Sequence, residues 1–261
     1  MKLSISNIGW KAEDDHEAYG LMKKYGYSGL EIAPTRIFSK KPYEKLSEAR
    51  IWYNTIHKEY GFVIPSMQSI WFGKKEKLFG TEEERIILLD YTKQAINFAE
   101  TIGCKNLVFG CPGNRQLTND SDAEVAAAFF KEIGCYALHH NTVIGMEANP
   151  PIYNTNYIND TLSALELIME VDSEGFKLNL DIGTMIQNNE NIDELIGNVR
   201  FINHVHISEP ELKPIKKNLL HKEIRKILEA EGYQGFVSVE MGTADLKNVE
   251  TVLQYVKEVF D

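Results

Sequence analysis

The sequence predicts a single (β/α)8 TIM barrel that takes up all of residues 1–261. Short apolar runs alternate with amphipathic segments, eight such runs occur, and their centres recur about every 33 residues, the size of one strand–helix unit. Barrels of roughly 250 residues commonly form one domain. An open doubly wound sheet also alternates, but the chain after the first run reads SNIGWKAEDD, without the glycine-rich phosphate turn that such sheets favour.

The eight apolar runs are short and bounded by turn residues, which is typical of buried strands. We expect strands at 3–9, 29–34, 62–67, 106–110, 142–148, 176–183, 201–208 and 236–241. The segments between them repeat apolar residues at i, i+3, i+4 and i+7, as helices do when one face packs on a sheet. Helices are therefore expected at 43–61, 82–103 and 221–232, each ending in glycine, and a last one at 246–260.

The composition excludes several classes of protein. At 43% hydrophobic and 25% charged residues the chain is close to the globular average, which argues against disorder, collagen and coiled coil. No run reaches the ~20 apolar residues of a membrane helix, and the N-terminus lacks a signal-peptide pattern. Cys104, Cys111 and Cys135 form an odd, unpatterned set, which favours a reducing cytoplasm. A net charge of −10 argues against nucleic acid as a partner and leaves a small molecule, while a homo-oligomer stays open.

Side-chain alternation indicates which residues face the barrel interior. Met146, Leu180, Val205 and Val239 are the apolar centres of the last four predicted strands and suit the side under the helices. The ionisable residues beside them then point inward, near the C-terminal strand ends where active sites of this fold lie. These residues are Glu147, Asp181, His204, His206 and Glu240. Several buried ionisable groups around one axis are costly unless an ion or a partner compensates them.

Four of these residues predict a metal site. Glu147, Asp181, His206 and Glu240 come from consecutive strands, and three carboxylates beside an imidazole repel one another unless a divalent cation lies between them. Oxygen-dominated ligation with one nitrogen suits Mn²⁺, Mg²⁺, Co²⁺ or Zn²⁺ without choosing among them. The alternative is that one or two of the four are ordinary polar residues of the interior. His204, on the same face as His206, is expected to support the ligands by hydrogen bonding.

Further residues near strand ends are candidates for substrate binding. Glu31 and Gln68 point to the interior in the first half of the barrel, where each could bind substrate or serve the structure. Arg115 and Lys213 follow the fourth and seventh predicted strands, where a basic group could hold a carboxylate or phosphate or simply lie at the surface. Trp71 follows the third strand, where an aromatic ring can stack on a sugar or pack in the core.

The motifs around the predicted metal ligands resemble those of a known superfamily. They are GMEANPP (145–151), LNLDIGT (178–184), HVHISEP (204–210) and FVSVEM (236–241). These motifs are similar to those of the xylose isomerase-like sugar isomerases and epimerases, a group that includes D-tagatose 3-epimerase, hydroxypyruvate isomerase and inosose dehydratase. The resemblance covers essentially the whole chain and implies the same four metal ligands. It also implies that Glu147 and Glu240 act as an acid/base pair on the two faces of the substrate.

Some positions depart from the family pattern. The sixth-strand motif is usually DxxH or DxGH, whose histidine contacts a substrate oxygen, whereas this chain has Thr184, which can hydrogen-bond but carries no charge. Asn149 stands where relatives often place a substrate contact, sometimes a second glutamate, so it is a candidate substrate-binding residue. The related endonucleases take histidines after strands three and four into a zinc cluster, and the segments 66–71 and 109–115 contain none.

The sequence therefore predicts a metal-dependent isomerase or epimerase of a small sugar, sugar phosphate or keto-polyol. In such a reaction the metal binds a carbonyl and an adjacent hydroxyl oxygen and stabilises an enediolate, while one glutamate removes a proton and the other returns it. Two alternatives remain. The same base could eliminate water, as in inosose dehydratase-like relatives, or the barrel could bind a sugar without catalysis, which Thr184 favours.

Overall fold

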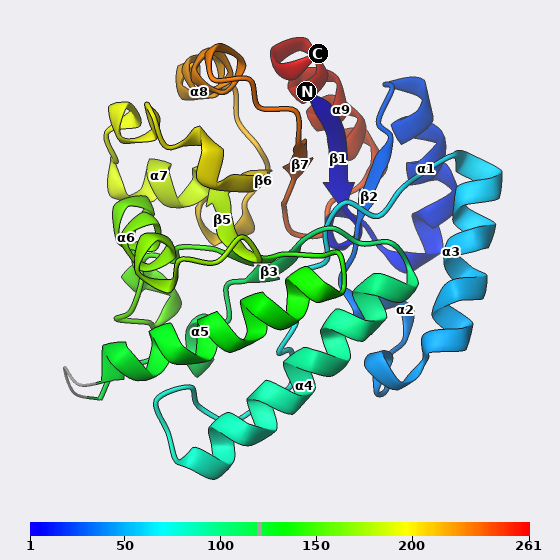
Figure 1. The fold of residues 1–261 in the computed structure, drawn as a ribbon. Helices are drawn as coiled ribbons and strands as arrows, with labels where there is room; N and C mark the ends of the chain where they lie inside the picture. The colour runs from blue at the N-terminus through cyan, green and yellow to red at the C-terminus, as the bar shows by residue number, and fades with distance from the viewer. Residues whose placement is uncertain (119–121) are drawn as a thin grey trace.

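The computed structural model describes residues 1–118 and 122–261 and shows parallel strands surrounded by helices (Figure 1). The strands lie in the order β2-β1-β7-β6-β5-β4-β3, and neighbours pair in parallel. Their bounds are Lys2–Ser6 (β1), Gly29–Glu31 (β2), Leu107–Phe109 (β3), Ile144–Met146 (β4), Phe176–Asp181 (β5), Ile202–Ile207 (β6) and Phe236–Val239 (β7). They overlap seven of the eight predicted runs.

The remaining run, 62–67, is not a regular strand, and in this respect the prediction is wrong. It nevertheless fills the place between β2 and β3. The Leu30 N–H donates to the Val63 carbonyl (2.9 Å), and isolated parallel bridges join Met67 to the chain on both sides. Pro65 accounts for the irregular pairing, because proline has no N–H to contribute to a ladder. The eight predicted positions thus form a TIM barrel with one irregular member.

Helices cover the outer side of the barrel (Figure 1). Their bounds are Asp15–Lys24 (α1), Pro34–Ile37 (α2), Leu46–Tyr60 (α3), Glu82–Thr101 (α4), Asp122–His139 (α5), Thr161–Val171 (α6), Ile182–Asn188 (α7), Leu219–Ala230 (α8) and Leu246–Phe260 (α9). Thr81 and Glu84 form a reciprocal capping box at the start of α4, and α3 ends at Gly61 in the left-handed conformation (φ 76°). None of the helices in the described ranges is long and apolar enough to cross a membrane.

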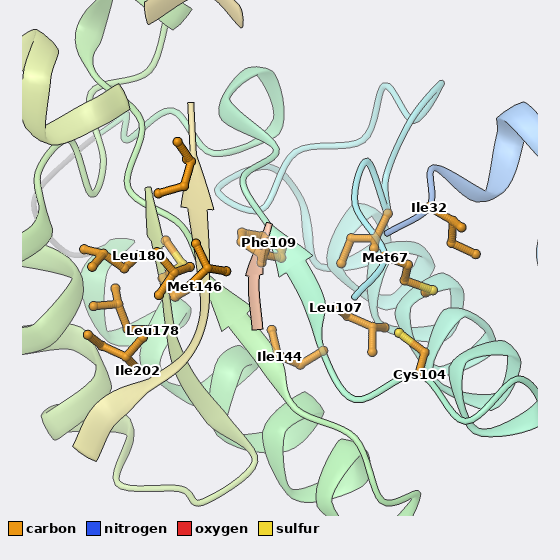
Figure 2. Packing of buried hydrophobic residues seen from close by; sticks show 14 of the residues in the cluster. Ile32, Met67, Cys104, Leu107, Phe109, Ile144, Met146, Leu178, Leu180 and Ile202 are labelled. Carbon is orange, nitrogen blue, oxygen red and sulfur yellow. The ribbon is translucent and has the colours of Figure 1, made fainter. Parts of the chain in front are cut away.

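Apolar side chains of neighbouring strands gather in one layer between the strands and the helices (Figure 2). Phe109 of β3, Met146 of β4 and Leu180 of β5 all belong to this layer and are fully buried. The Phe109 ring packs edge-on against Phe130 of α5, with ring centroids 4.9 Å apart. Since Met146 and Leu180 face the helices, the residues that follow them in the chain face the interior, as the alternation predicts.

Small and polar side chains fill the interior of the barrel. The Asn106 amide donates to Ser66 Oγ (3.0 Å) and to Asn179 Oδ1 (3.2 Å). These two hydrogen bonds link the start of β3 to the 62–67 segment and to β5. Gly145 makes room for this amide, because a Cβ at that position would lie 2.4 Å from Asn106 Oδ1. The interior is therefore a hydrogen-bonded polar layer, and the ionisable residues lie at its C-terminal end.

Candidate active site

Four ionisable side chains meet at the C-terminal end of the barrel. Glu147 follows β4, Asp181 ends β5, His206 lies on β6 and Glu240 follows β7. One potential ligand atom from each lies within 4.8 Å of the others. His206 Nδ1 lies 2.9 Å from Glu147 Oε1 and 3.2 Å from Glu240 Oε2. The structure thus brings the four predicted ligands to one point.

The register of the sheet explains this convergence. Asp181 and His206 are direct partners in the β5–β6 pairing, so their side chains lie at one height. The Glu240 N–H donates to the Ile207 carbonyl (2.9 Å), which continues the β6–β7 ladder past the end of β7. The Glu147 N–H likewise donates to a carbonyl of β3. Inward-pointing residues at the ends of adjacent parallel strands therefore share one small volume.

Asp181 has a second role as the N-cap of helix α7. Its Oδ1 accepts a hydrogen bond from the Thr184 N–H (2.5 Å), and its Oδ2 accepts one from Ser208 Oγ (2.6 Å). Helix α7 begins directly after β5, so the chain turns at the residue whose side chain caps the helix. These two hydrogen bonds fix the carboxylate at the edge of the cluster.

The cluster is short of positive charge. Burial and the neighbouring Glu147 raise the pKa of Asp181 to about 6. Burial also raises the pKa of Glu240 to about 7, although His206 opposes the rise. Burial alone would lower the pKa of His206, but Glu31 and Glu240 raise it well above its ordinary value. A divalent cation would relieve the carboxylate repulsion, and this oxygen-rich set with one imidazole nitrogen fits such an ion.

A hydrogen-bonded network holds His206 from behind. Glu31 is completely buried, and its Oε2 accepts hydrogen bonds from His206 Nε2 (3.0 Å) and His204 Nε2 (2.9 Å). Gln68 Nε2 donates to Glu31 Oε1 (3.2 Å). Burial alone would raise the pKa of Glu31, yet the two imidazoles hold it well below its ordinary value. With its Nε2 proton engaged by Glu31, His206 presents Nδ1 to the other three ligands.

A pocket of about 160 Å³ opens above the cluster. It is lined by Pro112, Glu147, Asn149, Tyr153, Asp181, Thr184, Ser208, Glu209, Leu212 and Glu240. Asn149 and Thr184 therefore lie where substrate binding was expected. The Thr184 hydroxyl donates to the Ala148 carbonyl (2.9 Å), so its proton is engaged by the protein while its oxygen can still accept a hydrogen bond.

Comparisons with known proteins agree with this geometry. Residues 20–259 match the family described as xylose isomerase-like TIM barrel. The chain belongs to this family. A comparison with curated protein sequences gave no match.

Several solved structures of sugar enzymes share the fold. The 3-keto-D-glucoside 4-epimerase of E. coli is 20% identical, with a TM-score of 0.79 over 99% of both chains. The D-psicose 3-epimerase of Clostridium cellulolyticum H10 is 16% identical, with a TM-score of 0.78 over 100% of both chains. A sugar phosphate isomerase/epimerase of Parabacteroides distasonis is 17% identical, with a TM-score of 0.72 over 98% of this chain and 93% of that one. At these identities the likeness establishes the fold.

Within this xylose isomerase-like barrel, five predicted substrate-binding residues do not line the pocket. They are Glu31, Gln68, Trp71, Arg115 and Lys213. Glu31 and Gln68 lie one layer below it, in the network behind His206. The Trp71 indole N–H donates to Thr92 (2.8 Å), and the ring packs against Phe109 (centroids 4.7 Å apart). Lys213 is exposed and forms an ion pair with Glu211.

Arg115 is buried beneath the pocket rather than facing it. Its Nη2 donates to the Glu147 carbonyl (2.9 Å) and to Asn149 Oδ1 (2.8 Å). Burial lowers its pKa to about 10. The guanidinium therefore holds the Glu147 carbonyl and the Asn149 amide on either side of Ala148, while its Nε is buried without a hydrogen-bond partner among the described residues.

The pocket also contains residues that the sequence did not single out as substrate-binding. They include Ser208, Glu209 and Leu212, which follow β6. The signal that could have found them is position, because loops after barrel strands carry the active site of this fold. Alternation does not predict the course of the backbone beyond the end of a strand. The orientation of these side chains therefore could not be predicted from the sequence.

Proposed function

We propose that this protein is a metal-dependent isomerase or epimerase of a small sugar, sugar phosphate or keto-polyol. The observation that supports this most is the meeting of Glu147 and Glu240 with Asp181 and His206 at the floor of one pocket. Membership of the xylose isomerase-like family and the sugar epimerases among its structural neighbours point the same way.

In this proposal the four residues hold one divalent ion, which supplies positive charge that acidifies the substrate and stabilises negative charge on its oxygen. Glu147 follows β4 and Glu240 follows β7, the two outer members of the four adjacent strands that carry the site, so the two carboxylates would approach a substrate from different sides. One removes a carbon-bound proton and the other returns a proton, either to the neighbouring carbon or to the opposite face.

Two neighbouring amide side chains orient the Glu147 carboxylate, which would act as the base. Asn179 Nδ2 donates to Glu147 Oε1 (2.8 Å), and Asn149 Nδ2 lies 3.4 Å from Oε2 as a second donor. Gly110 leaves space for this carboxylate, because a Cβ there would lie 2.8 Å from Glu147 Oε2. Glu240, whose Oε2 lies 3.2 Å from His206 Nδ1 on β6, is the second carboxylate of the pair and would return the proton.

We further propose a cytoplasmic location, which fits the three free cysteines, and a sugar or polyol as the only ligand besides the metal. That the protein could form a homo-oligomer stays a prediction.

Elemental analysis followed by deuterium exchange tests this function. We expect about one divalent ion per chain, as four protein ligands at a single point would hold. In D₂O, the Mn²⁺-loaded protein should place deuterium on carbon in at least one member of a panel of ketoses and inososes. Glu147→Gln and Glu240→Gln should each slow this exchange by roughly 100-fold or more, because acid/base groups contribute about that much. Glu211→Gln, a carboxylate outside the pocket, serves as the control.

Other outcomes would support the alternatives or reject the metal. A product lighter by one water would indicate a dehydratase, and ligand binding without any deuterium uptake would indicate a non-catalytic sugar-binding barrel. A purified protein that neither carries nor binds a divalent metal would contradict the central claim.

A further inference from the structure

The pocket is strongly acidic. Among the described residues that line it, the ionisable ones are the four carboxylates of Glu147, Asp181, Glu209 and Glu240, and tyrosine is the only other titratable type. A divalent ion would balance two of these four negative charges, and the buried Arg115 guanidinium beside Glu147 would balance a third, so the pocket keeps a net negative charge. A phosphate monoester brings a further charge of about −1.5 to −2 at pH 7. An anionic substrate would therefore meet a surface of its own sign in a partly dehydrated space.

The two basic residues that the sequence offered for an anion are engaged elsewhere. Arg115 is fully buried, and its guanidinium donates to the Glu147 carbonyl and to Asn149. Lys213 is exposed and paired with Glu211. A third candidate, Lys74, lines a neighbouring depression, but its ammonium lies 4.1 Å from the centre of the Tyr91 ring.

Backbone donors at the pocket are engaged as well. The N-terminus of α7 points at this site, and helix N-termini commonly bind phosphate. Here the Thr184 N–H donates to Asp181 (2.5 Å) and the Gly183 N–H donates to Ser208 Oγ (2.9 Å). Two protein acceptors thus take the donors that a phosphate would need.

The groups that remain suit a ligand with hydroxyl donors. Glu209 Oε1 accepts a hydrogen bond from the Lys216 N–H (3.0 Å), which leaves Oε2 to a ligand. Tyr153 Oη accepts from the Glu211 N–H (2.6 Å) and keeps its own proton to donate. A carboxylate oxygen is an acceptor only, so its natural partner is a ligand hydroxyl.

From this arrangement, and resting on the proposed function, we infer that the substrate is an uncharged, non-phosphorylated sugar or polyol and that Glu209 binds one of its hydroxyl groups. This choice separates the neutral sugars and polyols from the sugar phosphates that the sequence left open. Glu209 is then a specificity-determining residue, because its carboxylate accepts a hydrogen bond from a substrate hydroxyl and repels an anionic substrate.

Calorimetric titration of the Mn²⁺-loaded protein with matched pairs tests this inference. The probes are D-fructose, D-tagatose and D-psicose, each beside its 6-phosphate. We expect the neutral member to bind about tenfold or more tightly, since like charges at a binding surface are costly. Glu209→Gln should weaken binding of the neutral sugar and strengthen binding of its phosphate. The ratio of the two affinities should therefore move toward one. Glu44→Gln, an exposed glutamate that does not line the pocket, should leave this ratio unchanged.

The outcomes separate this inference from the proposed function. Equal or tighter binding of the phosphate esters, or no binding of any neutral ketose, overturns the inference. Deuterium uptake from a phosphate ester alone also overturns it while leaving the epimerase function intact. Preferential binding of a neutral sugar without deuterium uptake supports the inference and contradicts the epimerase function.

Discussion

His206 faces two environments with its two ring nitrogens. Nδ1 points to Glu147 and Glu240, whereas Nε2 donates to the buried carboxylate of Glu31. A histidine whose distal N–H is held by a carboxylate is oriented and more basic, which improves it as a metal ligand. We therefore propose that Glu31 acts through His206 as a positioning residue, whereas alternation alone left it open between substrate binding and a structural role.

Replacing Glu31 by glutamine tests that role. The amide is nearly isosteric, but it removes the charge that His206 and His204 face, so we expect Mn²⁺ affinity to fall by roughly 10- to 100-fold. Calorimetric titration with Mn²⁺ measures this directly. Thermal melting of the metal-free variant checks that the barrel still folds, and Glu44→Gln at the surface is the control. An Mn²⁺ affinity equal to that of the wild type would show that Glu31 serves only the packing.

At the scale of elements, one side chain of the β5–α7 junction both caps a helix and belongs to the candidate metal site. Asp181 caps α7 through the Thr184 N–H and also belongs to the ligand cluster. Two substitutions separate these functions. Asp181→Asn keeps an oxygen that can cap the helix and removes the charge, whereas Asp181→Ala removes both.

We expect both Asp181 variants to lose Mn²⁺ binding. Without metal, the alanine variant should be less stable than the asparagine variant, because both lack the carboxylate charge and only asparagine can cap the helix. Loss of an N-cap costs about 1 kcal/mol, which lowers the Tm of a barrel of this size by roughly 2–4 °C or less. Melting curves of the metal-free proteins beside Mn²⁺ titrations give both quantities. If the asparagine variant melts as low as the alanine variant, the cap contributes nothing.

The regular elements were predictable because their signals are local. Strand positions follow from short apolar runs. The helices α3, α4 and α8 follow from their period and a glycine stop, and α9 follows from its period alone. The third position was predicted as a strand, although Pro65 argued against regular pairing. Barrel closure supplies backbone partners on both sides of residues 62–67, so the segment keeps its place without forming a ladder.

The sequence predicted which side chains point to the barrel interior, but not how far along the barrel axis each of them lies. Alternation correctly turned Glu147, Asp181, His206 and Glu240 inward, and parallel register placed them at one height. It could not show that Glu31 lies a layer below, since depth depends on the stagger of β2 against β6. Long side chains in loops were least predictable, because contacts distant in sequence decide their course, as the Glu147 carbonyl does for Arg115.

At the scale of the whole molecule, the net charge of −10 is partly a property of the site. Carboxylates gathered inside the barrel make folding depend on pH and on metal together. A raised carboxylate pKa means that the folded state binds more protons than the unfolded chain, so stability falls as pH rises toward that pKa. The raised pKa of His206 acts in the same direction, since its stabilising proton is lost as pH rises further.

The directions of these pKa shifts predict that the stability of the metal-free protein falls as pH rises, whereas the stabilisation by bound metal grows. Asp181 and Glu240, with pKa values of about 6 and 7, should make the metal-free protein lose stability between about pH 4.5 and pH 7. Below that range Glu31, whose pKa is lowered, reverses the trend, because its stabilising charge is lost on acidification. Divalent metals bind the deprotonated ligands, so the stabilisation by Mn²⁺ should grow as pH rises from 5.5 to 8.

Melting temperatures at a series of pH values, with EDTA or with Mn²⁺, measure both trends. We expect the difference in Tm between the two forms to be larger at pH 8 than at pH 5.5 by at least roughly 2–4 °C, the shift that about 1 kcal/mol produces in a domain near this size. Glu240→Gln should flatten the metal-free trend, because the titrating group is gone, whereas Glu211→Gln should not. A Tm gain from Mn²⁺ that is constant across this range would mean that protons and metal do not compete for the cluster, and the four residues would then not be its ligands.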